Sequence, residues 1–429
     1  MIALPFIALV VTLLLGVPIA FALAGTGVFG IYLLKGNWDI VLEVLKNALL
    51  FVADYNLTTI PMFILMAFFS SSSGLARDLY TAASNWLAHV RGGLAIATVF
   101  ACAIFGAMSG ASVAAAAVMA PLAMTNMRRL GYSEVLAAGS VSVGATLDIL
   151  IPPSVPMVIY GLATQTSIGR LLVAGVIPGI ILGILLALCI LVWVTINPSH
   201  APKAVRVPQA ERWRSLWKIW PSLMLILIVL LLLYTGVATP TEVGALGAFM
   251  AGLIGVVMKR LTWHGALQAL RETIRTSTMI FLIMIGANIF GYFMTLSRVP
   301  NHVVEAVMAM NLNRWVIIIG ITVVYFLISM VMDEIPLLLI TLPLTFPLVT
   351  SVGFDPIWFG VLSMMMVAMG LVFPPVGMIA FVVSATAKVD LVTVYRGTSV
   401  MIISIFIAIV LVMIFPELAV WLPTTMRGK

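Results

Sequence analysis

The chain alternates between long apolar runs and short polar segments over its whole length. A helix needs roughly 20 apolar residues to cross a bilayer, and helices satisfy their own backbone groups there. The pattern therefore predicts an all-α polytopic membrane protein. The apolar runs are 2–15, 18–34, 57–73, 93–130, 135–163 and 171–196, and, after a polar segment, 223–234, 242–258, 277–296, 315–350, 357–387 and 391–415.

Residues 93–130 consist of two short apolar arms around a small polar centre, Phe105-Gly-Ala-Met-Ser-Gly-Ala-Ser112. Each arm is too short to cross a bilayer alone. We therefore expect a re-entrant helical hairpin here and a second one at 315–350. Backbone groups at such a tip need protein or a water-filled cavity around them, which makes each tip a candidate ion or solute site.

Two other runs contain a Pro-Pro pair where a continuous helix would otherwise be expected. The pair is Pro152-Pro153 in the run 135–163 and Pro374-Pro375 in the run 357–387. Proline lacks a backbone N–H and clashes with the preceding turn, so nearby carbonyl oxygens lose their helical partners. We expect two discontinuous helices whose free carbonyls suit Na⁺, with a simple kink as the alternative.

The order of runs before the polar segment repeats after it, which a fixed shift of 222 residues tests. Under this shift, Pro18, Pro121, Pro152 and Pro153 fall on Pro240, Pro343, Pro374 and Pro375. Chance predicts roughly 0.3 such coincidences over the compared window. The sequence thus predicts an internal duplication, with a first repeat at 1–196, a cytoplasmic linker with an amphipathic helix at 197–220, and a second repeat at 221–429.

The second copy is expected to lie upside down relative to the first. Five crossings precede it if each hairpin enters and leaves on one side, and five is odd. Sorted by this topology, the loops hold fifteen Lys and Arg residues on one side and seven on the other. Since Lys and Arg favour cytoplasmic loops, both termini are predicted to be periplasmic. Inverted repeats with paired interrupted helices are typical of secondary transporters.

Composition excludes several other classes of protein. Hydrophobic residues make up 63% of the chain and charged residues 9%, whereas soluble domains carry about a quarter charged residues. The net charge of +7 lies in loops between apolar runs, so it indicates membrane orientation and not nucleic-acid binding. No His pair or Ser-Lys dyad that would activate water occurs within an apolar run. We therefore expect a transporter and not an enzyme, with no organic cofactor.

Asp148, Asp333 and Glu334 are the carboxylates that the pattern places at membrane depth. Intramembrane acids indicate functional sites, as cation ligands or proton carriers. Alternatively, Asp333 or Glu334 caps the helix that follows. No Lys or Arg lies inside a predicted hairpin or break, so an anionic solute would need helix N-termini, hydroxyls or Na⁺ as counter-charge. The candidate solute-binding residues are Ser112, Asp148, Ser154, Thr164 and Thr386.

Short motifs along nearly the whole chain together resemble one family. They are Ile60-Pro-Met-Phe63, Gly92-Gly-Leu-Ala95, Phe105-Gly-Ala-Met-Ser-Gly-Ala-Ser112, Ile151-Pro-Pro-Ser154, Ser167-Ile-Gly169, Ala174-Gly-Val-Ile-Pro-Gly179, Asp355-Pro356 and Pro374-Pro-Val-Gly377. The chain is similar to the large membrane subunit of tripartite ATP-independent periplasmic (TRAP) transporters, the DctM-like family.

This resemblance implies an elevator-type transporter in the bacterial inner membrane, driven by the Na⁺ gradient. A small four-helix membrane subunit would brace its scaffold, and a periplasmic substrate-binding protein would deliver a small organic acid. The family's sodium sites lie between each hairpin tip and the facing break. They imply ligands at Ser109, Gly110, Ile151, Pro152 and Pro153 in one repeat and at Asp333, Glu334, Phe373, Pro374 and Pro375 in the other. The family's glycine in the second hairpin is replaced by Ser329 or Met330, and Asp333 is added.

Two alternatives to this function stay open at the level of sequence. A stand-alone Na⁺/dicarboxylate symporter with similar hairpins would need no partner proteins. A proton-conducting subunit of a membrane respiratory complex should carry Lys, Glu and His in successive spans, whereas only three acids lie at membrane depth here.

Overall fold

The computed structural model describes residues 3–202 and 207–426, and every regular element within those ranges is helical. In the first repeat these are α1 (Ala3–Leu14), α2 (Ile19–Lys35), α3 (Trp38–Phe51), η1 (Tyr55–Thr58), α4 (Thr59–Ser72), α5 (Leu75–Leu87), α6 (Gly93–Ser109), α7 (Ser112–Arg129), α8 (Glu134–Ala145), η2 (Thr146–Ile149), α9 (Val155–Thr164), α10 (Ile168–Ala174) and α11 (Val176–Ile196). The turn η3 (Pro198–His200) follows.

The second repeat shows the same helices in the same order. They are α12 (Gln209–Thr235), α13 (Pro240–Val257), α14 (Trp263–Ser297), α15 (Val299–Ala309), α16 (Arg314–Ser329), α17 (Glu334–Ser351), α18 (Pro356–Gly370), α19 (Met378–Ala387), α20 (Leu391–Ile414) and α21 (Glu417–Thr424). The agreement is closest for α7 and α17, which both contain 18 residues. The helices α3 and α4, bent by 51° at η1, correspond to the single 35-residue helix α14.

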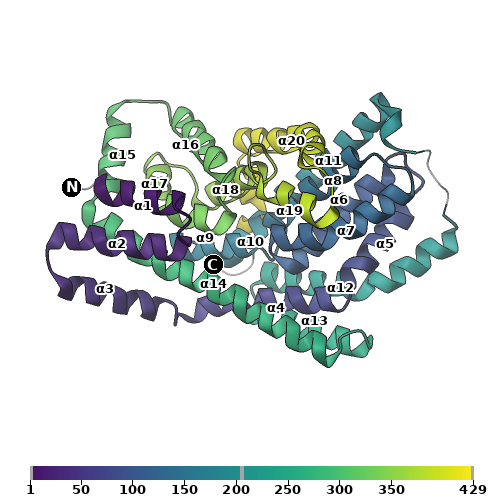
Figure 1. Ribbon diagram of the computed structural model, residues 1–429, viewed down its shortest axis with the longest axis horizontal. Coiled ribbons are helices and arrows are strands. Elements are labelled where there is room, and N and C mark those ends of the chain that lie inside the picture. Colours follow the sequence, from purple (N-terminus) through teal and green to yellow (C-terminus); the bar gives the residue numbers. More distant parts are fainter. Residues whose placement is uncertain (1–2, 203–206, 427–429) are drawn as a thin grey trace.

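The two repeats interleave instead of forming separate halves (Figure 1). Their contacts are reciprocal, since α2 packs on α14 while its counterpart α13 packs on α4. In the same way α7 packs on α19 and α17 packs on α9. Reciprocal contacts of this kind are produced by a two-fold axis. The predicted fold class is confirmed: an all-α polytopic membrane protein of two inverted-topology repeats, each with a hairpin and a discontinuous helix.

Six helical segments are long and apolar enough to cross a membrane, and a seventh is obtained if α3 and α4 count as one bent span. Large apolar side chains cover their outer surfaces, as at Ile184 and Phe249. Apolar outer surfaces are what lipid contact requires, because lipid tails offer no hydrogen bonds.

The polar segment differs from its prediction. Instead of a separate amphipathic helix that ends at residue 220, α12 runs without a break from Gln209 to Thr235, with Pro221 inside it. A proline removes one backbone hydrogen bond of a helix. The other helical hydrogen bonds of α12 continue on both sides of Pro221. The polar Trp213–Trp220 segment is thus the first part of a long helix, and residues 203–206 of the linker lie outside the described ranges.

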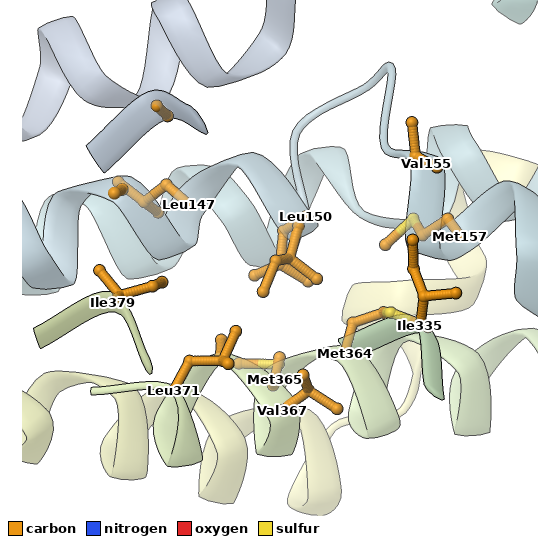
Figure 2. Packing of buried hydrophobic residues seen from close by; sticks show 14 of the residues in the cluster. Leu147, Leu150, Val155, Met157, Ile335, Met364, Met365, Val367, Leu371 and Ile379 are labelled. Atoms are coloured by element: carbon orange, nitrogen blue, oxygen red, sulfur yellow. The ribbon is translucent and has the colours of Figure 1, made fainter. Parts of the chain in front are cut away.

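The core between the repeats is built around the first helix break. Figure 2 shows Leu147, Leu150 and Met157 of the first repeat facing Met364 and Met365 of α18. Methionine has an unbranched, adaptable side chain, so it fills the irregular space beside a non-helical segment. The packing therefore holds the break of the first repeat against α18, the first half of the discontinuous helix of the second repeat.

Candidate functional site

The first break is held against the tip of the first hairpin. The backbone N–H of Val155 donates to the carbonyl oxygen of Gly110 over 3.4 Å. Gly110 has a φ of +61°, and a Cβ at this position would lie 3.1 Å from the carbonyl oxygen of Pro153. Glycine is therefore required here both by the backbone conformation and by the close approach of the break. Ser154 caps α9 by accepting from the N–H of Met157 at 3.4 Å.

The second break also contacts the tip of its hairpin, but the acceptor lies two residues before the position that matches Gly110. The N–H of Gly377, the counterpart of Val155, donates to the carbonyl oxygen of Met330 over 3.1 Å. The ring of Phe373 packs edge-on against Phe326 of α16, with centroids 5.0 Å apart. In both breaks the structure thus brings together the predicted tip and the predicted Pro-Pro segment.

Two carbonyls of the second break already have a partner. The hydroxyl oxygen of Tyr395 on α20 lies 2.7 Å from the carbonyl oxygen of Val376 and 3.0 Å from that of Pro375. Val173, the residue at the matched position of the first repeat, has no hydroxyl group. The second break therefore has a side-chain donor at a position where the first break has none.

Polar side chains from both repeats meet between the hairpins. Ser112 and Glu334 begin α7 and α17, and they are 222 residues apart, so they occupy the same position in the two repeats. The Ser112 Oγ lies 2.5 Å from Asp148 Oδ1 and 3.3 Å from Glu334 Oε2. All three side chains are buried, with exposed fractions of 0, 1 and 4% for Ser112, Asp148 and Glu334. We call these three residues the axial cluster.

Gly106 and Asp333 position the axial cluster. A Cβ at Gly106 would collide with the side chain of Asp148, so glycine lets η2 approach α6. Asp333 is the N-cap of α17, accepting from the N–H of Glu334 at 3.0 Å. The capping alternative for this acid is therefore confirmed. Within the described residues, the Oδ2 atom of Asp148 is buried and lacks a hydrogen-bond partner.

Within the described chain, Ser109, Thr164 and Thr386 form no hydrogen bond to this cluster. The Ser109 hydroxyl donates within its own helix, to the carbonyl oxygen of Gly106 over 3.4 Å. Thr164 and Thr386 lie at the far ends of α9 and α19, and their hydroxyls donate to Tyr160 and Val382 of the same helices. Thr164 is the tenth residue of α9 and Thr386 the ninth of α19, so each lies roughly 12–14 Å from the start of its helix at 1.5 Å per residue.

A cavity of about 610 Å³ lies between α9 and α17 on one side and α14 and α15 on the other. Its polar lining residues are Gln165, Asn288, Tyr292, Thr295, Arg298 and Asn301. Arg298, between α14 and α15, is the one Lys or Arg among the described lining residues. The sequence pattern missed it because it lies at a helix junction, outside every predicted hairpin and break. Thr164 adjoins the cavity through its neighbours Ala163 and Gln165.

Among the residues that the structure describes, no group of three His, Cys, Asp or Glu side chains is arranged to hold a metal ion. A cation at the breaks or at the axial cluster would therefore depend on hydroxyl and carbonyl oxygens as well as on carboxylates. Such mixed oxygen sets are the ligands expected where unwound helices coordinate Na⁺.

Comparison with known proteins shows that the chain is similar to bacterial permeases. The family described as "Tripartite ATP-independent periplasmic transporter, DctM component" matches residues 6–418. The C4-dicarboxylate TRAP transporter large permease protein DctM of Pseudomonas aeruginosa is 32% identical over 86% of both chains. The sialic acid TRAP transporter large permease protein SiaM of Vibrio cholerae is 29% identical over 88% of both chains.

A solved structure supports the same fold. The YdaH transporter of Alcanivorax borkumensis superposes with a TM-score of 0.63 over 92% of this chain and 91% of its own, at 15% sequence identity. At this identity the likeness concerns the fold alone.

Proposed function

This chain belongs to the DctM-component family, the large permease subunits of tripartite ATP-independent periplasmic transporters of the bacterial inner membrane, and from this premise we propose that it imports a small organic acid anion driven by the Na⁺ gradient. Its partners are a small four-helix membrane subunit and a periplasmic binding protein that delivers the anion. The observation that carries the proposal is the backbone contact between hairpin tip and helix break that occurs in both repeats.

Each tip and its break supply the ligands of one Na⁺. The first site draws on Ser109, Gly110 and the break at 151–153, where η2 has ended and α9 has not begun. The second draws on Asp333, Glu334 and the break at 373–375. Because the hydroxyl of Tyr395 donates to the carbonyl oxygen of Pro375, the second site depends more on carboxylate ligands than the first site does. Oxygen ligands from unwound backbone are the usual partners of Na⁺ in transporters.

The two hairpins and two discontinuous helices act as the moving body of an elevator. They contact one another across the repeats, through α7 with α19 and α17 with α9. The scaffold consists of α2, α4, α13 and α14, which also pack reciprocally. Reciprocal packing inside each body, with fewer contacts between bodies, is the arrangement that rigid-body sliding needs.

The cavity beside Arg298 receives the solute. It lies between the moving body (α9, α17) and the scaffold helix α14 with the adjoining α15, and Arg298 is on the periplasmic side in the predicted orientation. An arginine pairs with a carboxylate through two parallel hydrogen bonds, which gives the anion a counter-charge that the hairpin tips lack. The binding protein would release its ligand to this face.

The decisive experiment is uptake into proteoliposomes that contain this chain and its small subunit. Accumulation of the binding protein's ligand should require an inward Na⁺ gradient and the ligand-loaded binding protein together. Thermal-shift screening of the binding protein identifies the ligand. Equal uptake with K⁺ in place of Na⁺ would contradict Na⁺ coupling.

The same assay separates the alternatives. Uptake without the binding protein would favour a stand-alone Na⁺/dicarboxylate symporter. Proton flux without any solute would favour a respiratory proton channel. The channel is disfavoured because the buried acids in the described parts of the chain gather in one place instead of forming a relay along successive spans.

A further inference from the structure

We infer that a groove on the outer surface of the second hairpin holds one phospholipid, with an acyl chain in the groove and the phosphate at Arg314. The groove is a cavity of about 820 Å³ between α16 and α20. Its floor is α18, which packs on both of these helices (Figure 1). It shares no lining residue with the cavity beside Arg298, so lipid binding here is separate from the proposed binding of the solute.

The chemistry of the groove fits hydrocarbon. One end is lined by Trp315 at the start of α16 and Ile414 at the end of α20, and the other end by Phe326 and Phe373. Among the described lining residues, Thr322 carries the one hydroxyl group, and it donates within α16 over 2.8 Å. Polar groups of a peptide or a solute would lose their hydrogen bonds in such a groove, whereas an acyl chain has none to lose.

The length of the groove matches one leaflet of a bilayer. Trp315 and Phe326 are 11 residues apart on α16, which is about 16 Å at 1.5 Å per residue. The hydrocarbon core of a bilayer is about 30 Å thick, so one leaflet contributes about 15 Å. Tryptophan prefers the membrane–water interface, so Trp315 marks the mouth of the groove at the level of the headgroups. An acyl chain that enters beside Trp315 therefore ends near Phe373, at mid-membrane depth.

Arg314 provides the headgroup contact at this mouth. Its guanidinium carbon lies 5.9 Å from the ring centre of Trp315 and 5.4 Å from that of Phe354. Arg314 is exposed, and none of the ion pairs in the described parts of the chain involves it. The nearby carboxylate of Asp355 accepts from two N–H groups at the start of α18 instead. An arginine that lies over aromatic rings still presents its N–H groups, which pair with a phosphate through two parallel hydrogen bonds.

The first repeat closes the corresponding space. There α6 and α11 match α16 and α20, and α11 packs directly on α6. A Cβ at Gly183 of α11 would lie 3.9 Å from the ring of Phe100 on α6. The helix α5 also covers α6, whereas its counterpart α15 packs on α17 and leaves Ile319 and Val323 of α16 about half exposed. The open groove is therefore a feature of the second repeat, produced by the different position of one covering helix.

The inner end of the groove lies beside the second helix break. Phe373 of the break and Phe326 of α16 pack edge-on, and both line this end. An acyl chain there covers apolar rings that hold the break against the hairpin, and burial of apolar surface is stabilising. Bound lipid thus stabilises the second tip against its break.

The test measures lipid binding on the full chain purified in mild detergent together with its small subunit. Native mass spectrometry counts the lipid molecules bound per chain as phosphatidylglycerol is titrated. Diacylglycerol with the same acyl chains is the matched probe that lacks the phosphate. The thermal unfolding midpoint with and without each lipid reports whether binding stabilises the fold.

Two pairs of variants separate the acyl chain from the headgroup. Val323→Phe fills the groove, and Val324→Phe adds the same ring at the next residue, which does not line it. The two valines are 48% and 47% exposed, so they differ in position and not in burial. Arg314→Gln removes the headgroup contact, and Arg170→Gln removes the charge of another exposed arginine as its control.

We expect the wild type, Val324→Phe and Arg170→Gln to bind one phosphatidylglycerol per chain and to unfold at a higher temperature with it. Val323→Phe should lose both the bound lipid and the shift. Arg314→Gln should bind phosphatidylglycerol about tenfold more weakly, with diacylglycerol binding unchanged, because only the phosphate loses a charge-assisted pair.

Three results would overturn the inference. The first is an equal lipid count in Val323→Phe and Val324→Phe. The second is equal affinity of the wild type for phosphatidylglycerol and diacylglycerol, which would leave the phosphate without a role. The third is release of the small subunit, or of a second copy of the chain, by Val323→Phe, which would assign the groove to a protein helix. Loss of uptake alone bears on the proposed function and not on this groove.

Discussion

The two helix breaks share a backbone plan but differ in chemistry. In the first, Gly110 adopts a left-handed conformation against Pro153, and Ala111 begins α7 without a side-chain cap. In the second, the φ of Met332 lies outside the left-handed region, and Asp333 caps α17. The polar groups at the first tip are therefore mainly those of its backbone. At the second tip they include the carboxylates of Asp333 and Glu334.

The same difference extends to what surrounds each break. Asp148 stands before the first Pro-Pro pair where Gly370 stands before the second. Tyr395 donates to carbonyls of the second break, whereas Val173 at the matched position has no hydroxyl group to donate to those of the first. A duplicated fold thus conserves where a site lies, while individual substitutions decide what each copy binds. Substitutions in one repeat at a time therefore test which of these differences affects transport.

The largest effect is expected from Gly110→Val. A β-branched residue at φ +61° is strained by about 1–3 kcal/mol, and its Cβ would press on the Pro153 carbonyl. Uptake should fall at least about tenfold, with a lower unfolding midpoint. Met332→Val, at the matched position of the second tip, should retain most activity. Equal losses in both variants would show that the tips are not different in this respect.

Removing the cavity's positive charge should give the next largest effect. Arg298→Asn keeps a residue that tolerates the φ of +53° while abolishing the pairing with a carboxylate. We expect KM for the delivered anion to rise about tenfold, equivalent to about 1.4 kcal/mol, with little change in the unfolding midpoint. Arg170→Asn, which changes a charge outside the lining of the cavity, is the control. An unchanged KM for Arg298→Asn would remove the cavity from the solute's path.

A smaller effect is expected from Tyr395→Phe. The variant frees the carbonyls of Pro375 and Val376 and loses about 1 kcal/mol of hydrogen bonding. The unfolding midpoint should fall slightly, and the Na⁺ dependence of uptake should change, because the second break becomes more like the first. Tyr55→Phe, at an exposed hydroxyl, controls for the loss of a phenol. A Na⁺ dependence identical to the wild type would mean that break carbonyls do not bind the ion.

The smallest effect is expected from Thr164→Ala combined with Thr386→Ala. Both hydroxyls donate to carbonyls of their own helices, so their removal costs little. Uptake should stay within about twofold of the wild type, corresponding to about 0.4 kcal/mol. A loss of about tenfold or more would restore the solute-binding role that the sequence assigned to them.

Much of the architecture was predictable because the signals are local. Apolar run length, Pro-Pro pairs and the spacing of 222 residues predict spans, hairpins, breaks and duplication without any knowledge of packing. The prediction failed to join the two parts of α12, because an internal proline such as Pro221 looks like a helix end in the sequence. The motifs of the first tip and of both breaks also indicated the family that the comparisons show.

What the sequence determined by itself is thus the order and inversion of the helices, since hydrophobic periodicity and proline act on the chain locally. Only the tertiary structure decided that Ser112 meets Asp148 and Glu334 at the two-fold axis, that Arg298 faces a cavity, and that Tyr395 reaches the second break. These contacts join residues far apart in the chain. Their geometry depends on how two copies of one unit pack against each other, which no local pattern records.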